Sequence, residues 1–156
     1  DYSYEYSEGF IAEIVAAPAS SAGEETAVGD YTVTLTELDR DATAEVLDRA
    51  PSAGDPDHNY VIARFDAVYN GEGDGRPWLD LSPELVGTDN RIYTVLGCTV
   101  ELSMRGADQE LLSKGDSVTH EVCFDVPDSA LGEDSRLGLR MILAEENAED
   151  VYWRLP

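Results

Sequence analysis

The amino-acid sequence predicts an all-β protein, a sandwich of two antiparallel sheets built from about eight or nine short strands. Two segments carry this prediction. Residues 114–127 (KGDSVTHEVCFDVP) begin at a turn, alternate apolar with polar residues and end at a proline, and residues 59–70 (NYVIARFDAVYN) alternate in the same way. A period of two is typical of strands that are buried on one side. We find no convincing amphipathic helix, and short strands separated by turns favour a sandwich.

The N-terminal part of the sequence is the least regular. We expect residues 1–28 to form an N-terminal extension or linker, or to add an edge strand, and residues 29–156 to form the sandwich domain. Tyrosines alternate with polar residues in the first six positions, which favours a loosely held terminus or an added edge strand. Residues 10–15 are predicted as a short strand, and the small and polar residues 16–29 as a loop.

The next segments open the predicted domain. Residues 31–36 (YTVTLT) alternate, with the threonines facing outward. Residues 42–48 fit either a strand or one or two turns of helix, and we favour the strand. Residues 51–58 (PSAGDPDH) are rich in Pro, Gly and Asp, which predicts a loop.

The later strands are shorter. Residues 78–85 are predicted as an edge or bulged strand, because Pro83 cannot donate a ladder hydrogen bond. Residues 88–90 (TDN) predict a hairpin turn, since Asp and Asn tolerate positive φ. Further strands are expected at residues 99–104, 117–126, 137–143 and 151–155, with turns at 106–109 and 145–150.

The central segment assigns residues to two faces. Its inward face carries Val118, His120, Val122, Phe124 and Val126, and its outward face carries Ser117, Thr119, Glu121, Cys123 and Asp125. We therefore expect His120 to be a partly buried structural histidine. His58, the other histidine, lies in a predicted loop, and two separated histidines do not provide a metal-ligand set.

Cys98 and Cys123 are the two cysteines of the chain. An even count in a chain with the character of a secreted protein favours a disulfide between them. Two free, buried thiols are the alternative. Cys123 has the parity of the polar face of its strand, whereas Cys98 shares parity with apolar residues. A break at Gly97 would place Cys98 in a turn and remove this conflict.

The charge balance excludes several classes of function. The chain has 33 acidic and 10 basic residues, a formal net charge of −23, and Lys114 as its only lysine. This excess repels phosphate backbones and anionic membranes, so we expect no nucleic-acid partner. No apolar run approaches the roughly 20 residues of a membrane-spanning helix. The acidic surface is expected to be simply solvated, with salt adaptation or ion binding as the alternative.

Aromatic residues are the candidates for ligand contact. Trp78 lies in the irregular segment at residues 78–85, and Tyr2, Tyr4 and Tyr6 lie near the N-terminus. Aromatic side chains often anchor contacts with proteins and glycans, although core packing is the more common role of a sandwich tryptophan. These four residues form the weak contact site that the sequence predicts.

One loop has the spacing of a calcium site. Asn70, Glu72 and Asp74 occupy positions 1, 3 and 5 of a segment with Gly75 at position 6, as at the start of an EF-hand loop. Position 12, which holds the closing acid in that motif, is Leu81 here. An ordinary inter-strand loop is the simpler interpretation. We expect no cofactor apart from this weak calcium candidate.

Four segments, taken in order, resemble motifs of a family of extracellular immunoglobulin-like domains of unknown function that includes a mycobacterial secreted immunogenic-protein branch. They are NYVIARFDAVYN, LVGTDNRIY, KGDSVTHEVCFDVP and DVYWRLP. The resemblance covers roughly residues 29–156, and Asn90 stands where the family pattern has Gly. It implies an immunoglobulin-like fold and export from actinobacterial or other Gram-positive cells, often as a lipoprotein. It supplies no catalytic residues.

We therefore expect a non-enzymatic, secreted or cell-surface-tethered binding or structural module, whose protein or glycan partner is unknown. The start of the sequence at Asp1, without a signal peptide, favours a mature or trimmed product, with a lipid anchor upstream as one form of tethering. One alternative is a calcium- or salt-dependent module with its ion loop at residues 70–75. A carboxylate-based hydrolase is the third hypothesis, but among 33 acids some pair always has suitable spacing.

Overall fold

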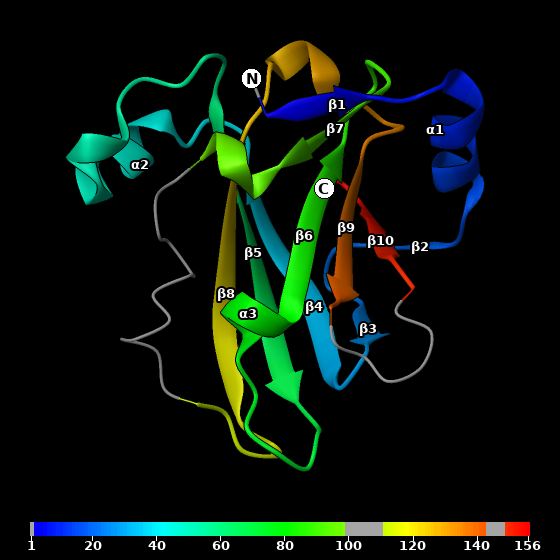
Figure 1. Cartoon of the computed structure of the whole chain (residues 1–156), viewed down its shortest axis with the longest axis vertical. Coiled ribbons are helices and arrows are strands. Elements are labelled where there is room, and N and C mark those ends of the chain that lie inside the picture. Colours follow the sequence, from blue (N-terminus) through cyan, green and yellow to red (C-terminus); the bar gives the residue numbers. More distant parts are fainter. Residues whose placement is uncertain (1, 99–110, 143–148) are drawn as a thin grey trace.

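The computed structural model describes residues 2–98, 111–142 and 149–156. These residues form two β-sheets that pack face to face, one of six strands and one of four (Figure 1). The predicted all-β sandwich is confirmed. The described part of the chain has ten strands rather than eight or nine, because three of them come from the N-terminal 28 residues.

The four-stranded sheet has the order β3-β4-β5-β8, and all its neighbours are antiparallel. Its strands are β3 (Glu25–Val28), β4 (Tyr31–Asp39), β5 (Tyr60–Tyr69) and β8 (Ser117–Asp125). The longest unbroken pairing joins β5 to β8, from Tyr60 opposite Asp125 to Val68 opposite Ser117. The two segments with the clearest alternation in the sequence are therefore neighbours in this sheet.

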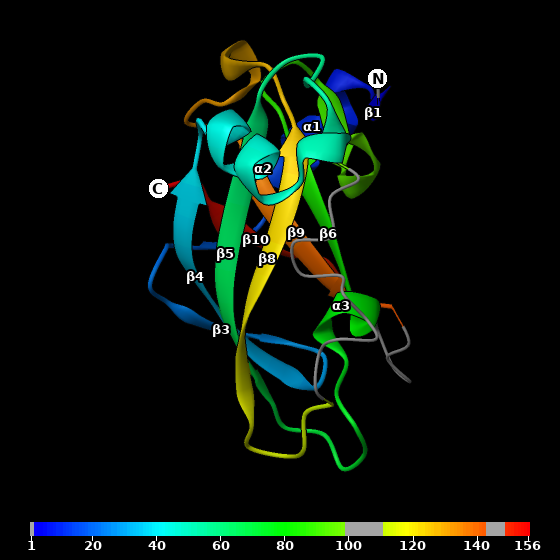
Figure 2. The ribbon, with the colours of Figure 1, turned by 90° about the vertical axis from the view of Figure 1, so that its left-hand side faces the viewer.

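The six-stranded sheet has the order β1-β7-β6-β9-β10-β2. Its strands are β1 (Ser3–Glu5), β7 (Arg91–Thr94), β6 (Leu81–Val86), β9 (Arg136–Met141), β10 (Val151–Arg154) and β2 (Ala19–Ser20). Only β10 and β2 are parallel among these pairs of described strands. Figure 2 looks onto β4, β5 and β8, with β6, β9 and β10 of this second layer behind them.

The expected edge position of the strand containing Pro83 is wrong. β6 is paired on both sides, with β9 along Leu81 to Val86 and with β7 from Glu84 onward. Pro83 lies where β6 has only β9 as a partner, so its missing N–H costs no ladder bond to β7. Residues 78–80, predicted as part of this strand, belong to the short helix α3 (Pro77–Asp80).

Two other predicted strands are helices. Residues 10–15 lie in α1 (Glu8–Ala16), and residues 42–48 lie mostly in α2 (Thr43–Arg49). In each case the buried residues recur at helical spacing and pack on the outer face of a sheet. The expectation of no helix was thus wrong for two segments, α1 with nine residues and α2 with seven. None of the helices in the described residues is long and apolar enough to cross a membrane.

The remaining short elements are three turns of 3₁₀ helix, at Pro51–Ala53, Val95–Gly97 and Asp128–Ala130. Asn90, in the predicted hairpin turn between β6 and β7, has φ of 59°, as that turn chemistry requires. The predicted loop at residues 16–29 contains β2 and β3. The strand at 99–104, the turn at 106–109 and most of the turn at 145–150 lie outside the described residues, and the division of the chain at residue 29 stays a prediction.

The core lies between the two sheets. Phe65 of β5 and Phe124 of β8 are fully buried from one side, and Leu137, Leu139 and Trp153 from the other. The rings of Phe65 and Trp153 meet edge to face at 5.4 Å between centroids, an arrangement that aromatic pairs favour. The inward position predicted for Phe124 is confirmed.

His120 is buried on this inner face, opposite Phe65 in the register of β5 and β8, and is 3% exposed. Its Nε2 atom has no hydrogen-bond partner in the described structure. Burial lowers the pKa of His120 from 6.5 to about 4, and the neighbouring Glu121 carboxylate only partly opposes this effect. His120 is therefore neutral at physiological pH.

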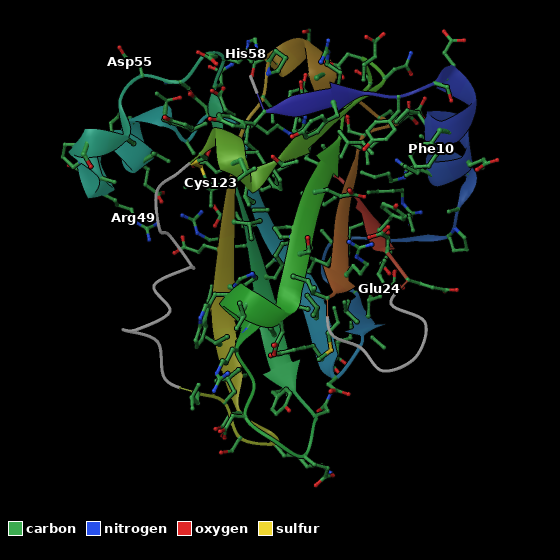
Figure 3. All side chains as sticks on the ribbon, in the orientation of Figure 1. Phe10, Glu24, Arg49, Asp55, His58 and Cys123 are labelled. Carbon is green, nitrogen blue, oxygen red and sulfur yellow. A yellow bond between two sulfur atoms is a disulfide. The ribbon has the colours of Figure 1, made fainter. Side chains whose placement is uncertain are left out.

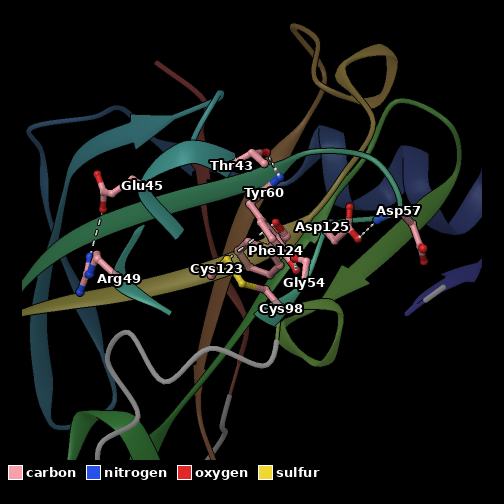
Figure 4. The surroundings of a disulfide bond; sticks show 10 residues. All are labelled: Thr43, Glu45, Arg49, Gly54, Asp57, Tyr60, Cys98, Cys123, Phe124 and Asp125. Carbon is pink, nitrogen blue, oxygen red and sulfur yellow. Dashed lines mark hydrogen bonds and ion pairs between the residues drawn. A yellow bond between two sulfur atoms is a disulfide. The ribbon is translucent and has the colours of Figure 1, made fainter. Parts of the chain in front are cut away.

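Cys98 and Cys123 form a disulfide with a Cα–Cα distance of 5.6 Å (Figure 4). Cys98 follows the 3₁₀ turn at Val95–Gly97. The alternation of inward and outward residues along a strand therefore does not decide which way Cys98 faces. Cys123 does lie on the outer face of β8, but this end of the face is covered. The disulfide belongs to a second buried cluster with Ala42, Val46, Tyr60 and Ile62.

Breaking this disulfide is expected to destabilise the fold by about 3 kcal/mol, because it closes a 25-residue separation in the unfolded chain. Guanidinium unfolding of the Cys98→Ala/Cys123→Ala variant and of the reduced wild type measures this effect. Both midpoints should fall to similar values. A reduced protein with an unchanged midpoint would contradict the expected role of the bond.

The neutral His120 is expected to make stability depend on pH. Because its folded pKa is below its unfolded value, the unfolded state binds more protons between pH 6.5 and about 4. The contribution of His120 to stability should therefore be full above pH 6.5, fall by on the order of 3 kcal/mol as the pH drops to about 4, and change no further below that.

Urea unfolding of His120→Leu across this range isolates the effect, since leucine cannot titrate. The variant should lose less stability than the wild type between pH 6.5 and 4. His58→Gln is the matched control, because His58 is exposed, and it should keep the wild-type slope. An unchanged slope in His120→Leu would show that this histidine is not buried in its neutral form.

Candidate functional site

Four exposed aromatic side chains lie along β1 and the first turn of α1. They are Tyr2, Tyr4, Tyr6 and Phe10, which are 51%, 54%, 39% and 44% exposed. We call this set the aromatic strip. Tyr6 and Phe10 stack with 5.0 Å between ring centroids, so β1 and the helix present one continuous surface. Figure 3 labels Phe10 on α1.

The register of β1 on β7 determines which way the strip faces. Tyr4 lies opposite Ile92, and Ile92 lies opposite Val86 of β6. Directly opposite residues of antiparallel strands share a face. Ile92 and Val86 pack against Ile11 and Ile14 of α1, so this face is the outer face of the six-stranded sheet. The tyrosines therefore flank the helix on the side away from the core.

Backbone hydrogen bonds fix both ends of β1. The Thr94 amide donates to the Tyr2 carbonyl at 3.1 Å, and the Tyr6 amide donates to the Asn90 carbonyl at 2.9 Å. Arg91 of β7 donates to the Ser3 hydroxyl and lies 4.0 Å from the Glu5 carboxylate. The terminus that we expected to be loose or to add an edge strand forms a strand at one edge of the six-stranded sheet.

α1 begins at a capped end and is held at the other. The Ser7 hydroxyl accepts a hydrogen bond from the Phe10 amide at 3.2 Å, as an N-cap does. At the C-terminal end, the Arg136 guanidinium donates to the Val15 carbonyl at 3.3 Å. Arg136 is 7% exposed, and a cation at the C-terminus of a helix offsets the negative end of its dipole. Both ends keep Phe10 in place beside Tyr6.

Sequence reasoning missed Phe10. It assigned residues 10–15 to a strand, in which Phe10 would have no relation to the tyrosines. The available signals were the serine at the N-cap, Glu8 in the first turn, and the helical spacing of Ile11 and Ile14.

Trp78 is not part of the aromatic strip. It lies in α3, which packs beside the far end of β6, away from β1 (Figure 1). Its side chain is partly buried, while the neighbouring Leu79 is 54% exposed. The four aromatic residues that the sequence nominated thus fall in two separate places, and only the three tyrosines lie together.

The proposed ion loop follows β5. The Asn70 side-chain amide donates to the Thr32 hydroxyl at 2.9 Å, and the Glu72 carboxylate pairs with Lys114 at 2.7 Å. The Glu72 carboxylate is thus engaged with a cation, Asn70 makes its contact through the amide nitrogen, and Asp74 is exposed. No group of three or more His, Cys, Asp or Glu side chains in the described residues is arranged to hold a metal ion.

A half-buried carboxyl group lies on the same outer face as the aromatic strip. The Tyr152 hydroxyl donates to Glu84 at 3.4 Å, and the two side chains close over Gly138. A Cβ atom on Gly138 would come within 3.0 Å of both. Burial, with the nearby Asp150 carboxylate, raises the pKa of Glu84. Burial also raises the pKa of Tyr152, and the carboxylates of Asp150 and Glu84 add to this effect. The register of three strands brings these residues together, so no local sequence pattern predicts them.

The outer face of the four-stranded sheet has a different character. A shallow hollow of about 420 Å³ is lined by Glu25, Thr32, Thr34, Asp66, Val68, Ser117, Val118 and Thr119. Beyond it, Arg64 forms ion pairs with Glu37, Glu45 and Glu121 at 2.6–3.1 Å. This face offers hydroxyl and charged groups but no aromatic lining. We therefore take the aromatic strip as the candidate functional site.

Comparison with known proteins gives a fold and no activity. No protein-family model and no curated protein matches the chain. The fold is similar to that of the YjhA protein of Bacillus subtilis, with a TM-score of 0.53 and 14% identity over 88% of this chain and 99% of that chain.

Two further solved structures are similar at lower TM-scores. An uncharacterised β-sandwich protein from Clostridium difficile has a TM-score of 0.49 and 12% identity, over 89% of this chain and 95% of that one. The secreted protein MPT63 of Mycobacterium tuberculosis has a TM-score of 0.49 and 16% identity, over 89% of this chain and 99% of that one. At 14% identity, the likeness to the YjhA protein supports the fold alone, and no function follows from these comparisons.

Proposed function

We propose that this protein is a non-enzymatic binding module of the cell exterior, and that the aromatic strip contacts its protein or glycan partner. The observation that carries this proposal is the exposure of four neighbouring aromatic side chains, each 39–54% accessible, on one outer face. Exposed apolar clusters of this kind mark interaction sites more often than single exposed residues do.

The exposure of these tyrosines is not a general property of the fold. Tyr31, Tyr60, Tyr69 and Tyr93 are all 5% exposed or less. Leaving aromatic surface in water forgoes about 25 cal/mol for each Å² that burial would remove. A partner that covered the strip would recover this free energy, and tyrosine offers a large amphipathic contact with few rotatable bonds.

The strip is also preorganised for contact. Its tyrosines lie on a hydrogen-bonded strand, and Phe10 lies on a helix that is capped at one end and held by Arg136 at the other. Side chains that are already ordered lose little conformational entropy on binding.

The disulfide supports a location outside the cytoplasm. Cys98 and Cys123 are each 4% exposed and lie in a packed cluster, which is how a structural disulfide is built. Such bonds persist in oxidising compartments and are rare in the cytosol of most organisms. In its more specific form, the proposal is that the protein belongs to the exported immunoglobulin-like family and is tethered through an upstream lipid anchor. The motif resemblance supports this form, and the disulfide is compatible with export.

The strip variant Tyr4→Ser/Phe10→Ser tests the contact surface. Labelled wild-type protein is first screened on arrays of glycans and of cell-surface protein segments. Each partner found should bind the variant at least tenfold more weakly, because truncating a central aromatic anchor typically costs more than 1 kcal/mol.

Leu79→Ser is the matched control, because Leu79 is equally exposed, at 54%, but belongs to α3. It should keep wild-type affinity, and circular dichroism should show that both variants are folded. Partners that bind the strip variant as tightly as the wild type would refute the assignment of the strip as the contact surface.

A further inference from the structure

A groove runs along the flank of α1 that faces away from Phe10. Its volume is about 500 Å³, within the range of sites that hold small molecules. It lies between α1, the β6–β7 turn and the loop before β9, and is lined by Glu8, Ile11, Ala12, Val15, Ala16, Gly87, Thr88, Asn90 and Asp134. We call it the α1 groove.

The groove has an apolar floor because of the order of residues in α1. Residues 8, 11, 12, 15 and 16 recur at helical spacing on one face, and four of them are apolar. Ala12 and Ala16 are small, so the helix wall leaves the space in front of it unfilled. Thr88 and Asn90 add polar groups at the turn.

The charges of the lining are all negative. Glu8 and Asp134 supply two carboxylates, and no Lys, Arg or His lines the groove. Neither carboxylate has an ion pair or hydrogen bond within the described parts of the chain. Arg136, at the C-terminal end of the helix, is 7% exposed and donates to backbone carbonyls of Val15, Glu133 and Ser135. The net charge of −23 adds a long-range field of the same sign.

We propose that the α1 groove binds a small amphipathic organic cation, an ammonium group carried on an apolar body. The apolar body lies on Ile11, Ala12 and Val15, and the ammonium group lies between Glu8 and Asp134. An anionic ligand would meet two unpaired carboxylates, and a neutral one would leave their attraction unused. This ligand site is separate from the aromatic strip, so the proposal does not rest on the proposed function.

Titration followed by ¹H–¹⁵N correlation spectra tests the site with three probes of one chain length. Hexyltrimethylammonium should cause saturable shifts at the amides of Ile11, Ala12, Gly87 and Asn90. The neutral 1-hexanol should bind several-fold more weakly, and hexanoate should cause no saturable shifts there. Because the attraction is electrostatic and partly exposed, added salt should weaken the binding of the cation.

Two variants separate charge from shape. Glu8→Gln/Asp134→Asn should weaken the ammonium probe about fivefold, the effect expected for losing two exposed ion pairs. Ala12→Leu fills the groove from an exposed helix position and should abolish the saturable shifts. The control Glu13→Gln/Glu133→Gln removes two acids from the same helix and loop outside the groove lining, and should keep wild-type affinity.

The proposal is overturned if hexanol or hexanoate binds as tightly as the ammonium probe, or if the control variant loses as much affinity as Glu8→Gln/Asp134→Asn. Shifts that spread over the acidic surface without saturating at the groove would equally contradict it. Tyr4→Ser/Phe10→Ser should leave this binding unchanged, so failure of the groove and failure of the strip are distinguishable.

Discussion

The contact between Phe65 and Trp153 is the interaction on which the rest of the structure depends. It joins β5, which pairs with strands on both sides in the four-stranded sheet, to β10 of the six-stranded sheet. Each ring is fully buried, and dispersion and hydrophobic burial act over the whole of both faces around it. Every outer-face feature requires these two layers to be in place, because α1, α2 and the disulfide pack on strands whose inner residues form this core.

The two outer faces are used differently. On the four-stranded sheet, α2 and the disulfide cover one end, where Tyr60 and Ile62 would otherwise be exposed. The Arg64 ion pairs join α2 to the sheet through Glu45, and hydroxyl groups meet solvent at the other end. On the six-stranded sheet, α1 covers Val86 and Ile92 and leaves an exposed surface on each of its flanks. One flank carries the aromatic strip, and the other carries the acidic, apolar α1 groove. A single short helix therefore organises both candidate contact surfaces.

Alternation predicted β5, β8 and the core because those strands bury one whole face, and Phe124 and Val122 follow that period. The same rule does not show where both faces are covered: Cys123 lies on the outer face of β8 as its parity indicates, but that end of the face is buried beneath α2, which was not predicted. α1 was missed because only Ile11 and Ile14 of its nine residues are buried, too few for a clear helical period. The tyrosines were nominated from their type alone, and Phe10 joined them only through the register of β1 and the cap at Ser7. Trp78 and the tyrosines are separated by topology, which local sequence does not encode.

The central claim is that the sandwich buries its other tyrosines and leaves those of the aromatic strip accessible. Nitration of the native protein with tetranitromethane, mapped residue by residue by mass spectrometry, tests it most directly. The account predicts rapid modification of Tyr2, Tyr4 and Tyr6, slower modification of the partly buried Tyr152, and protection of Tyr31, Tyr60, Tyr69 and Tyr93 until the protein is unfolded. Nitration of Tyr31 or Tyr93 at the rate of Tyr4 would contradict the fold, and protection of the three N-terminal tyrosines would contradict the strip.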